Sequence, residues 1–165
     1  MKRILAAVGE DGFGAQVVST AATLAKQLNV PLTICHVMSE EMYQEIQTRL
    51  NSEQLGKTFV FTHAEQRANN IAKNASKNLS LAELDFETRG AVGNPTLEII
   101  TLAKELDVNL IVMGFEGLHG LNKMRALGSV SRAVMEDAIC PVMIVPLPAD
   151  IEPEVLETEE VYATN

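Results

Sequence analysis

The stretch from residue 109 to residue 145 constrains the fold most strongly, because two apolar runs in it enclose a glycine-rich segment and a helical pattern. Residues 110–113 form the first apolar run, which has the length of a buried strand. A Gly128-Ser129 pair opens the helical pattern, which ends near Ala138. The second apolar run consists of Val142, Met143, Ile144 and Val145. The order strand, glycine loop, helix, strand is typical of an α/β protein.

Two interpretations of the glycine loop remain open on the residues alone. The loop contains Gly114, Gly117 and Gly120, and glycine allows a backbone to come close to a ligand. The free N–H groups of the helix that starts after Gly128 favour an anion, so the loop is a candidate phosphate site. The alternative is an ordinary loop closed by a helix cap, with Ser129 as the N-cap residue.

The rest of the chain alternates strand patterns with helical patterns. Strands are expected over residues 4–8, 31–38 and 84–88, with Leu84 and Phe86 on one face of the third, and residues 89–93 are expected to be a loop. Helices are expected over residues 14–28, from Ser39 onward, and over residues 62–79. A further helix starts with Asn94 as N-cap and Pro95 at its first position. Its expected buried face consists of Leu97, Ile99, Ile100, Ala103 and Leu106.

This alternation predicts one α/β domain with a doubly wound, mostly parallel sheet of five strands covered by helices on both faces. Ligands of such sheets bind at the carboxyl ends of the strands. Gly9, Met38 and Gly114 all fall at such ends, so a pocket among them is the expected site.

Charge and composition exclude several classes of protein. The net charge of −9 argues against nucleic acid or an anionic membrane as the main partner. The sequence has no apolar run of the roughly 18 residues that span a bilayer and no secretory signal pattern, so we expect a cytoplasmic protein. Six of the nine excess negative charges lie in residues 147–165, which carry no Lys or Arg. We expect this tail to be solvated and partly disordered, with partner binding as an alternative.

No catalytic or metal-binding motif is evident. Cys35 and Cys140 are expected to be buried reduced thiols, and no cysteine or histidine cluster has zinc spacing. His36 lies in a strand pattern and is expected to be a core histidine, while His63 has no partner in sequence and His119 lies in the glycine loop. Neither a serine-hydrolase elbow nor a P-loop is present.

At this point the sequence resembles the universal stress protein family, over residues 2–146. The pattern of that family is a strand, a loop of the form G-x-x-G-x9-G-[ST], a helix, and a final strand after Cys-Pro-Val. The chain has Gly114, Gly117, Gly128-Ser129-Val130-Ser131 and Cys140-Pro141-Val142 in that order. The run ILAAV, the strand end His36-Val37 and the loop Gly93-Asn94-Pro95 also match.

The resemblance implies a sheet of order 3-2-1-4-5 in a three-layer sandwich of the adenine-nucleotide alpha-hydrolase type. It implies a homodimer in which the last strand, Val142 to Val145, pairs across a two-fold axis. Many members bind ATP, and the loop backbone and Ser/Thr hydroxyls hold the phosphates. Carried over, the nucleotide-contacting set is Val8, Gly9, Glu10, Asp11, Val37, Met113, Gly114, Gly117, Gly128, Ser129, Val130 and Ser131.

Two departures from the family pattern bear on nucleotide binding. The ATP-binding pattern has an Asp at the end of the first strand, and this chain has Gly9 there, followed by Glu10 and Asp11. The spacing between Gly117 and Gly128 is one residue longer than the pattern. Such an insertion costs little free energy but shifts the N–H groups that must reach a phosphate.

Three functions follow from these observations. The first is a nucleotide-binding stress-response homodimer that binds ATP, with Mg²⁺ arriving on the nucleotide, and acts through an unidentified protein partner. The second is a nucleotide-free dimeric interaction protein of the same family, which fits Gly9. The third is an enzyme acting on an adenylyl group, which lacks a catalytic set in the sequence. We therefore expect a non-enzymatic protein, with slow ATP hydrolysis at most.

Overall fold

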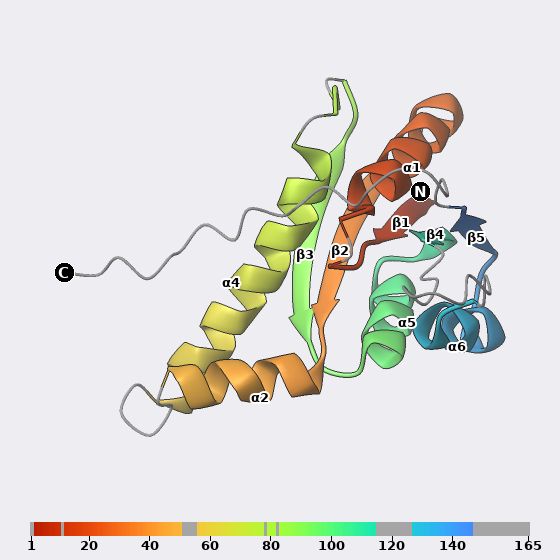
Figure 1. Ribbon diagram of the computed structural model, residues 1–165. Coiled ribbons are helices and arrows are strands. Elements are labelled where there is room, and N and C mark those ends of the chain that lie inside the picture. Colours follow the sequence, from red (N-terminus) through yellow and green to blue (C-terminus); the bar gives the residue numbers. More distant parts are fainter. Residues whose placement is uncertain are drawn as a thin grey trace, which may run out of the picture.

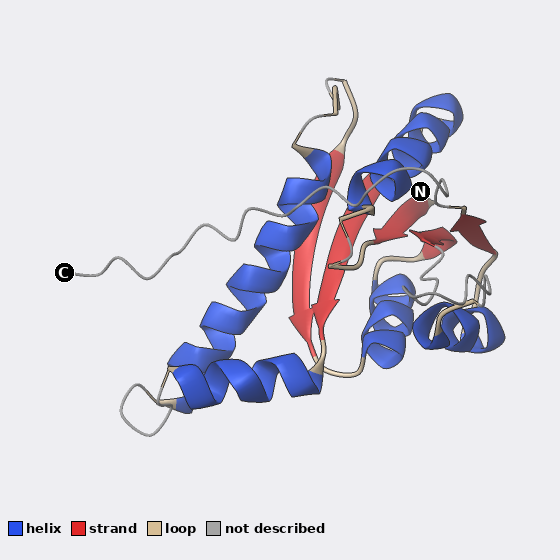
Figure 2. Cartoon of the chain, in the orientation of Figure 1, coloured by secondary structure: helices blue, strands red, loops and turns tan. Residues whose placement is uncertain are grey.

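The structure is a computed structural model that describes residues 2–10, 12–50, 56–77, 79–81, 83–114 and 127–146. Helices separate the successive strands along the chain, with two helices between the second strand and the third (Figure 2). The strands are β1 (Arg3–Ala7), β2 (Leu32–Met38), β3 (Phe86–Val92), β4 (Val108–Gly114) and β5 (Val142–Val145). The helices are α1 (Gly14–Leu28), α2 (Glu40–Arg49), α4 (Lys57–Ser76), α5 (Pro95–Glu105) and α6 (Ser129–Asp137).

The strands form one parallel sheet of order β3-β2-β1-β4-β5, which confirms the predicted fold class and strand order. Helices α1 and α4 pack on one face and α5 and α6 on the other (Figure 1). The central strand β1 is buried on both faces, as its uninterrupted apolar sequence predicts. None of the helices in the described ranges is long and apolar enough to cross a membrane.

Local sequence signals explain where several helices start. The side chain of Ser39 accepts a hydrogen bond from the backbone N of Met42, and that of Asn94 accepts one from the backbone N of Leu97. Both residues therefore act as N-caps, as predicted for Asn94 and at the helix start predicted for Ser39, and Pro95 occupies the first turn of α5. The αL conformation of Asn29 ends α1, at the predicted residue.

The prediction for the third strand was wrong in position. β3 starts at Phe86, rather than at Leu84, and continues through Val92, so residues 89–92 are strand and not loop. Its register with β2 pairs Leu32 with Phe86 and Met38 with Val92. The weak alternation of apolar and polar residues predicted a strand over residues 84–88. Pairing with the whole length of β2 sets the limits of β3 instead.

Other predictions need smaller corrections. Helix α4 starts at Lys57, five residues before the expected start, and Leu97 is 62% exposed and does not belong to the buried face of α5. The N-cap of α6 is Gly128, so Ser129 is the first helical residue and not the cap. The acidic tail, residues 147–165, lies outside the described residues.

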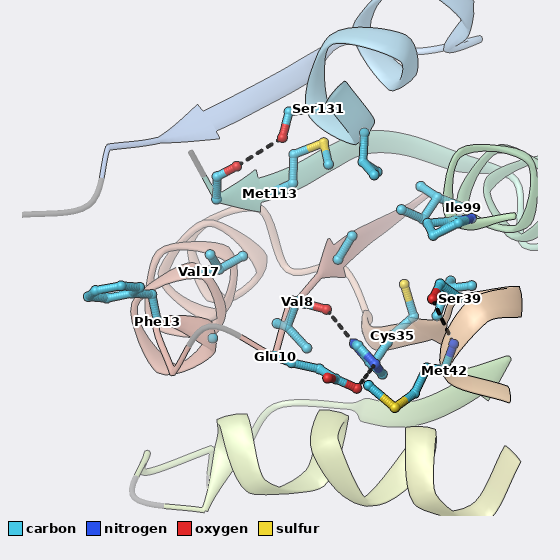
Figure 3. Close-up of a pocket in the computed structure, with 18 residues that line it drawn as sticks. Val8, Glu10, Phe13, Val17, Cys35, Ser39, Met42, Ile99, Met113 and Ser131 are labelled. Carbon is cyan, nitrogen blue, oxygen red and sulfur yellow. Dashed lines mark hydrogen bonds and ion pairs between the residues drawn. The ribbon is translucent and has the colours of Figure 1, made fainter. Parts of the chain in front are cut away.

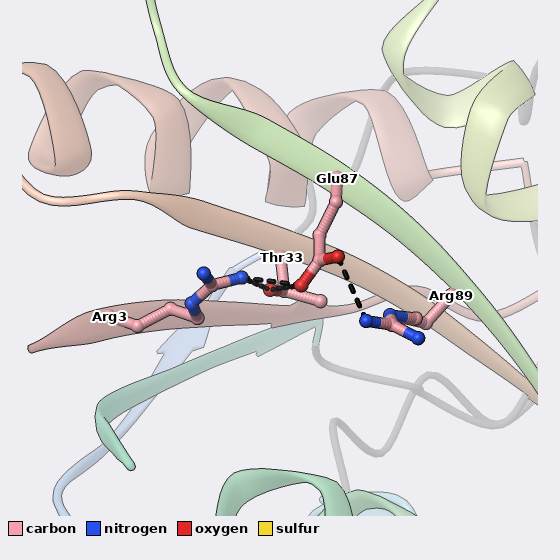
Figure 4. Close-up of polar contacts among 4 residues, drawn as sticks. All are labelled: Arg3, Thr33, Glu87 and Arg89. Carbon is pink, nitrogen blue, oxygen red and sulfur yellow. Dashed lines mark hydrogen bonds and ion pairs between the residues drawn. The ribbon is translucent and has the colours of Figure 1, made fainter. Parts of the chain in front are cut away.

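A polar cluster joins three strands of the sheet (Figure 4). The Arg3 guanidinium donates to the Thr33 hydroxyl, at 2.7 Å, and to the Glu87 carboxylate. The second oxygen of Glu87 accepts from Arg89 at 3.0 Å. Both oxygens of Glu87 therefore have partners, and the cluster satisfies polar groups within the sheet.

Candidate functional site

A cavity of about 230 Å³ lies at the carboxyl ends of the strands, where the sequence predicts a site. Its described lining comes from the ends of β1, β2 and β4, from the first turns of α1, α2, α5 and α6, and from the segments between them (Figure 3). The lining residues are Ala7, Val8, Gly9, Glu10, Phe13, Gly14, Val17, Cys35, His36, Val37, Ser39, Met42, Pro95, Ile99, Met113, Gly114, Val130 and Ser131.

The predicted site residues divide into three groups. Eight line the cavity: Val8, Gly9, Glu10, Val37, Met113, Gly114, Val130 and Ser131. Gly128 and Ser129 lie next to the cavity at the start of α6, while Asp11 and Gly117 fall outside the described residues. The structure thus brings together residues from three strand ends that are far apart in the sequence.

The start of α6 forms one side of the cavity. Gly128 is the N-cap, and no side chain in the described part of the chain caps the helix, so the first N–H groups have no capping side chain among those residues. The Ser131 hydroxyl donates to the carbonyl oxygen of Gly114 at 3.1 Å, since a carbonyl can only accept. Ser131 therefore connects α6 to the end of β4. Its hydroxyl hydrogen is used in this bond and is not available for donation to a ligand.

The opposite side holds a pair of ionisable residues, Glu10 and His36. His36 is 5% exposed, and its Nδ1 donates to the Val8 carbonyl oxygen at 2.8 Å. Its Nε2 lies 3.3 Å from Oε1 of Glu10. The His36 contact lowers the pKa of Glu10, and the charge of Arg67 adds to this, although partial burial opposes both. Glu10 is therefore a carboxylate at neutral pH.

Three residues that line the cavity, His36, Pro95 and Ile99, were not predicted as site residues from the sequence. His36 was expected to be a satisfied core histidine, and the structure shows it buried but hydrogen-bonded to the described residues through one ring nitrogen only. Its place beside Val37, at the carboxyl end of β2, was the signal that could have marked it. Pro95 and Ile99 of α5 also line the cavity, and their place in the first turns of a helix that follows a strand end is a comparable signal.

The described lining has no arrangement for covalent or metal chemistry. Burial raises the pKa of the Cys35 thiol to about 12, so it stays protonated and is a poor nucleophile. No group of three or more metal-ligating side chains occurs among the described residues. The cavity pairs an apolar wall with a helix start that favours anions and with one carboxylate.

Comparisons with known proteins agree with this architecture. The model of the universal stress protein family matches residues 1–146. The universal stress protein YxiE of Bacillus subtilis is 33% identical over 151 residues, which cover 87% of this chain and 97% of that protein. The structure of UspA from Lactobacillus plantarum matches with a TM-score of 0.65 and 22% identity, over 87% of this chain and 97% of that one.

A universal stress protein crystallised in complex with cAMP also shares the fold. It matches with a TM-score of 0.53 and 24% identity, over 88% of this chain and 96% of that chain.

Proposed function

Because this chain belongs to the universal stress protein family, we propose that it is a homodimer that binds an adenine nucleotide, with ATP as the expected ligand. We propose further that it is cytoplasmic and acts on a protein partner in the stress response. A structural relative is known in complex with cAMP, which favours a nucleotide as the ligand class. The nucleotide would control the surface that the partner contacts.

The cavity at the strand ends is the observation that carries this proposal. Val37, Ile99 and Met113 line it and offer an apolar wall for a base. Gly128 and the uncapped start of α6 lie on the side of Gly114, and free N–H groups with the positive end of a helix dipole favour a phosphate. Mg²⁺ would arrive on the nucleotide, held by phosphate oxygens and water.

We propose binding rather than turnover as the main activity. A general base works best with a pKa near the operating pH, and the lowered pKa of Glu10 makes that carboxylate a weak base. The proton of Ser131 is engaged with Gly114. Any ATP hydrolysis should therefore be slow.

A thermal melt of the purified protein with and without Mg-ATP is the direct test. For a dissociation constant of about 10 μM and about 1 mM ATP, linkage gives about 2.7 kcal/mol of stabilisation. For a domain of this size the melting temperature should rise on the order of 5–10 °C. A rise with ATP and none with GTP supports the proposal. No rise, in protein shown to contain no nucleotide, contradicts it.

Gly128→Asp tests whether the start of α6 is the phosphate site. The backbone of Gly128 has φ −60° and ψ 157°, which Asp adopts readily, and Asp is a good N-cap, so the helix should persist. Its charge should lower ATP affinity at least about tenfold by repelling the phosphates. Gly128→Asn is the matched control, since it caps the helix without a charge. Equal ATP affinity in the two variants, measured by calorimetry, would rule out this phosphate site.

Gly9 favours a second candidate, the nucleotide-free dimer. The family pattern has a carboxylate where this chain has Gly9, and the described lining encloses only about 230 Å³, below the roughly 300 Å³ at which ligand pockets usually begin. Under this alternative the protein purifies as a dimer without nucleotide and shows no thermal shift with ATP.

A further inference from the structure

The Glu10–His36 pair has a polar group that the described residues leave without a hydrogen bond. Nε2 of His36 is fully buried and has no hydrogen-bond partner among the described residues. Glu10 Oε1 lies 3.3 Å away, which is a direct polar contact, but the contact is not aligned as a hydrogen bond. A buried polar atom without a partner costs free energy, so its retention at a cavity wall points to a role in binding.

Glu10 is the one carboxylate among the described residues that line the cavity. Its side chain is 40% exposed, so it contacts His36 and still has open surface. It directly follows Gly9, the position at which the family pattern has its Asp. A carboxylate offers two oxygens that only accept hydrogen bonds, and such charge-assisted bonds are strong. The ligand group that fits Glu10 therefore carries donors and no negative charge.

The geometry separates this carboxylate from the place proposed for the phosphates. Glu10 and Ser131 lie on opposite sides of the cavity (Figure 3). A phosphate beside Glu10 would be repelled, whereas the start of α6 attracts it. The part of a nucleotide that lies next to Glu10 is therefore uncharged. The two adjacent hydroxyls of a ribose are two hydrogen-bond donors, which match the two acceptor oxygens of the Glu10 carboxylate.

We propose that Glu10 accepts the 2′- and 3′-hydroxyls of a ribose and that His36 holds the carboxylate in place, so that the cavity selects ribonucleotides over deoxyribonucleotides. This inference rests on the proposed nucleotide-binding function. His36 is a positioning residue: its Nδ1 is fixed on the Val8 carbonyl oxygen, so its ring presents Nε2 to Glu10.

The test compares dissociation constants of AMP, 2′-deoxy-AMP and 3′-deoxy-AMP by calorimetry. The unaltered protein should bind AMP about tenfold or more tightly than either deoxynucleotide, since a bond to a charged acceptor is lost. Glu10→Gln keeps the shape of the side chain and removes its charge, so this ratio should fall to about twofold. Glu40→Gln, on the exposed first turn of α2, is the matched control and should keep the full ratio.

A His36→Leu variant tests whether His36 positions the Glu10 carboxylate or only stabilises the fold. Damage to the fold alone would weaken all three nucleotides equally, whereas loss of positioning should lower the preference for AMP. Should His36→Leu fail to fold, Glu10→Gln still decides the question.

Four outcomes would overturn the inference. Equal binding of AMP and both deoxynucleotides would refute sugar selection and leave the nucleotide-binding function standing. A preference that survives Glu10→Gln would place the selection on another residue. If Glu10→Gln instead removes a preference for AMP over IMP, then Glu10 contacts the amino group of the base. Binding of no nucleotide at all would refute the proposed function together with this inference.

Discussion

Two serines near the start of α6 show how differently identical side chains can act within one turn. Ser131 is 1% exposed, and its hydroxyl connects the helix to the carbonyl oxygen of Gly114 at the end of β4. Ser129 is exposed at the first helical position. The sequence motif predicts both as ligand contacts. The direction in which each hydroxyl points depends on packing between α6 and β4, which the sequence does not display.

We expect Ser131→Ala to lower the free energy of unfolding by about 1–2 kcal/mol, because it removes a hydrogen bond and leaves the Gly114 carbonyl oxygen without that donor. Ser129→Ala should change it by less than about 0.5 kcal/mol, as an exposed substitution. Urea denaturation of both variants measures the difference. Equal effects would mean that the Ser131 hydrogen bond contributes nothing to stability.

At the scale of elements, the sequence predicts those whose signals are local. The helix start at Ser39, the cap Asn94 and the short strand β5 all lie where the sequence places them. β3 was misplaced because its limits depend on β2, a partner about fifty residues earlier in the chain. The cavity could be predicted at the strand ends, but not the part of α5 that lines it, since that depends on how the helix packs.

At Gly90 the strand β3 lies very close to the helix α4. A Cβ atom at this position would lie 2.3 Å from the backbone N of Asn69 and from the backbone O of Glu65, both in α4. Neither is the movable end of a side chain, so α4 would have to shift away from β3.

Gly90→Ala should therefore lower the free energy of unfolding by about 3 kcal/mol or more, at the upper end of what overpacking costs. Gly56→Ala is the control: a Cβ atom there has no atom of the described residues within 4 Å, and with φ +82° the substitution should cost only about 1 kcal/mol of backbone strain. Chemical denaturation followed by circular dichroism compares the two. A Gly90→Ala variant as stable as Gly56→Ala would show that α4 can move at little cost.

For the whole molecule, the sheet leaves two edge strands, β3 and β5. Met143 in the edge strand β5 is 37% exposed, and Ile139, just before this strand, is 57% exposed. Apolar side chains at a sheet edge favour pairing with another chain. The family resemblance predicts a dimer through this strand, and the exposure of Met143 suits that prediction.

Met143→Lys should shift the protein from dimer to monomer, because a charge would have to be buried at the interface. Leu28→Lys, at the end of α1, introduces the same charge at a side chain that is 59% exposed and should leave the dimer intact. Size-exclusion chromatography with light scattering measures both masses. A dimer that persists in Met143→Lys, or an unaltered protein that is a monomer, would refute assembly through β5.

The central place of β1 has a consequence for how the chain folds during synthesis. Ile4 pairs with Leu32 on one side and with Leu110 on the other. In synthesis β1 can gain its neighbour β2 early, but its second neighbour, β4, appears only after about a hundred further residues. Contacts between residues so distant in sequence slow folding. Until β4 emerges, one edge of an apolar strand stays open, and a nascent chain at this stage is most exposed to misassociation and most in need of chaperones.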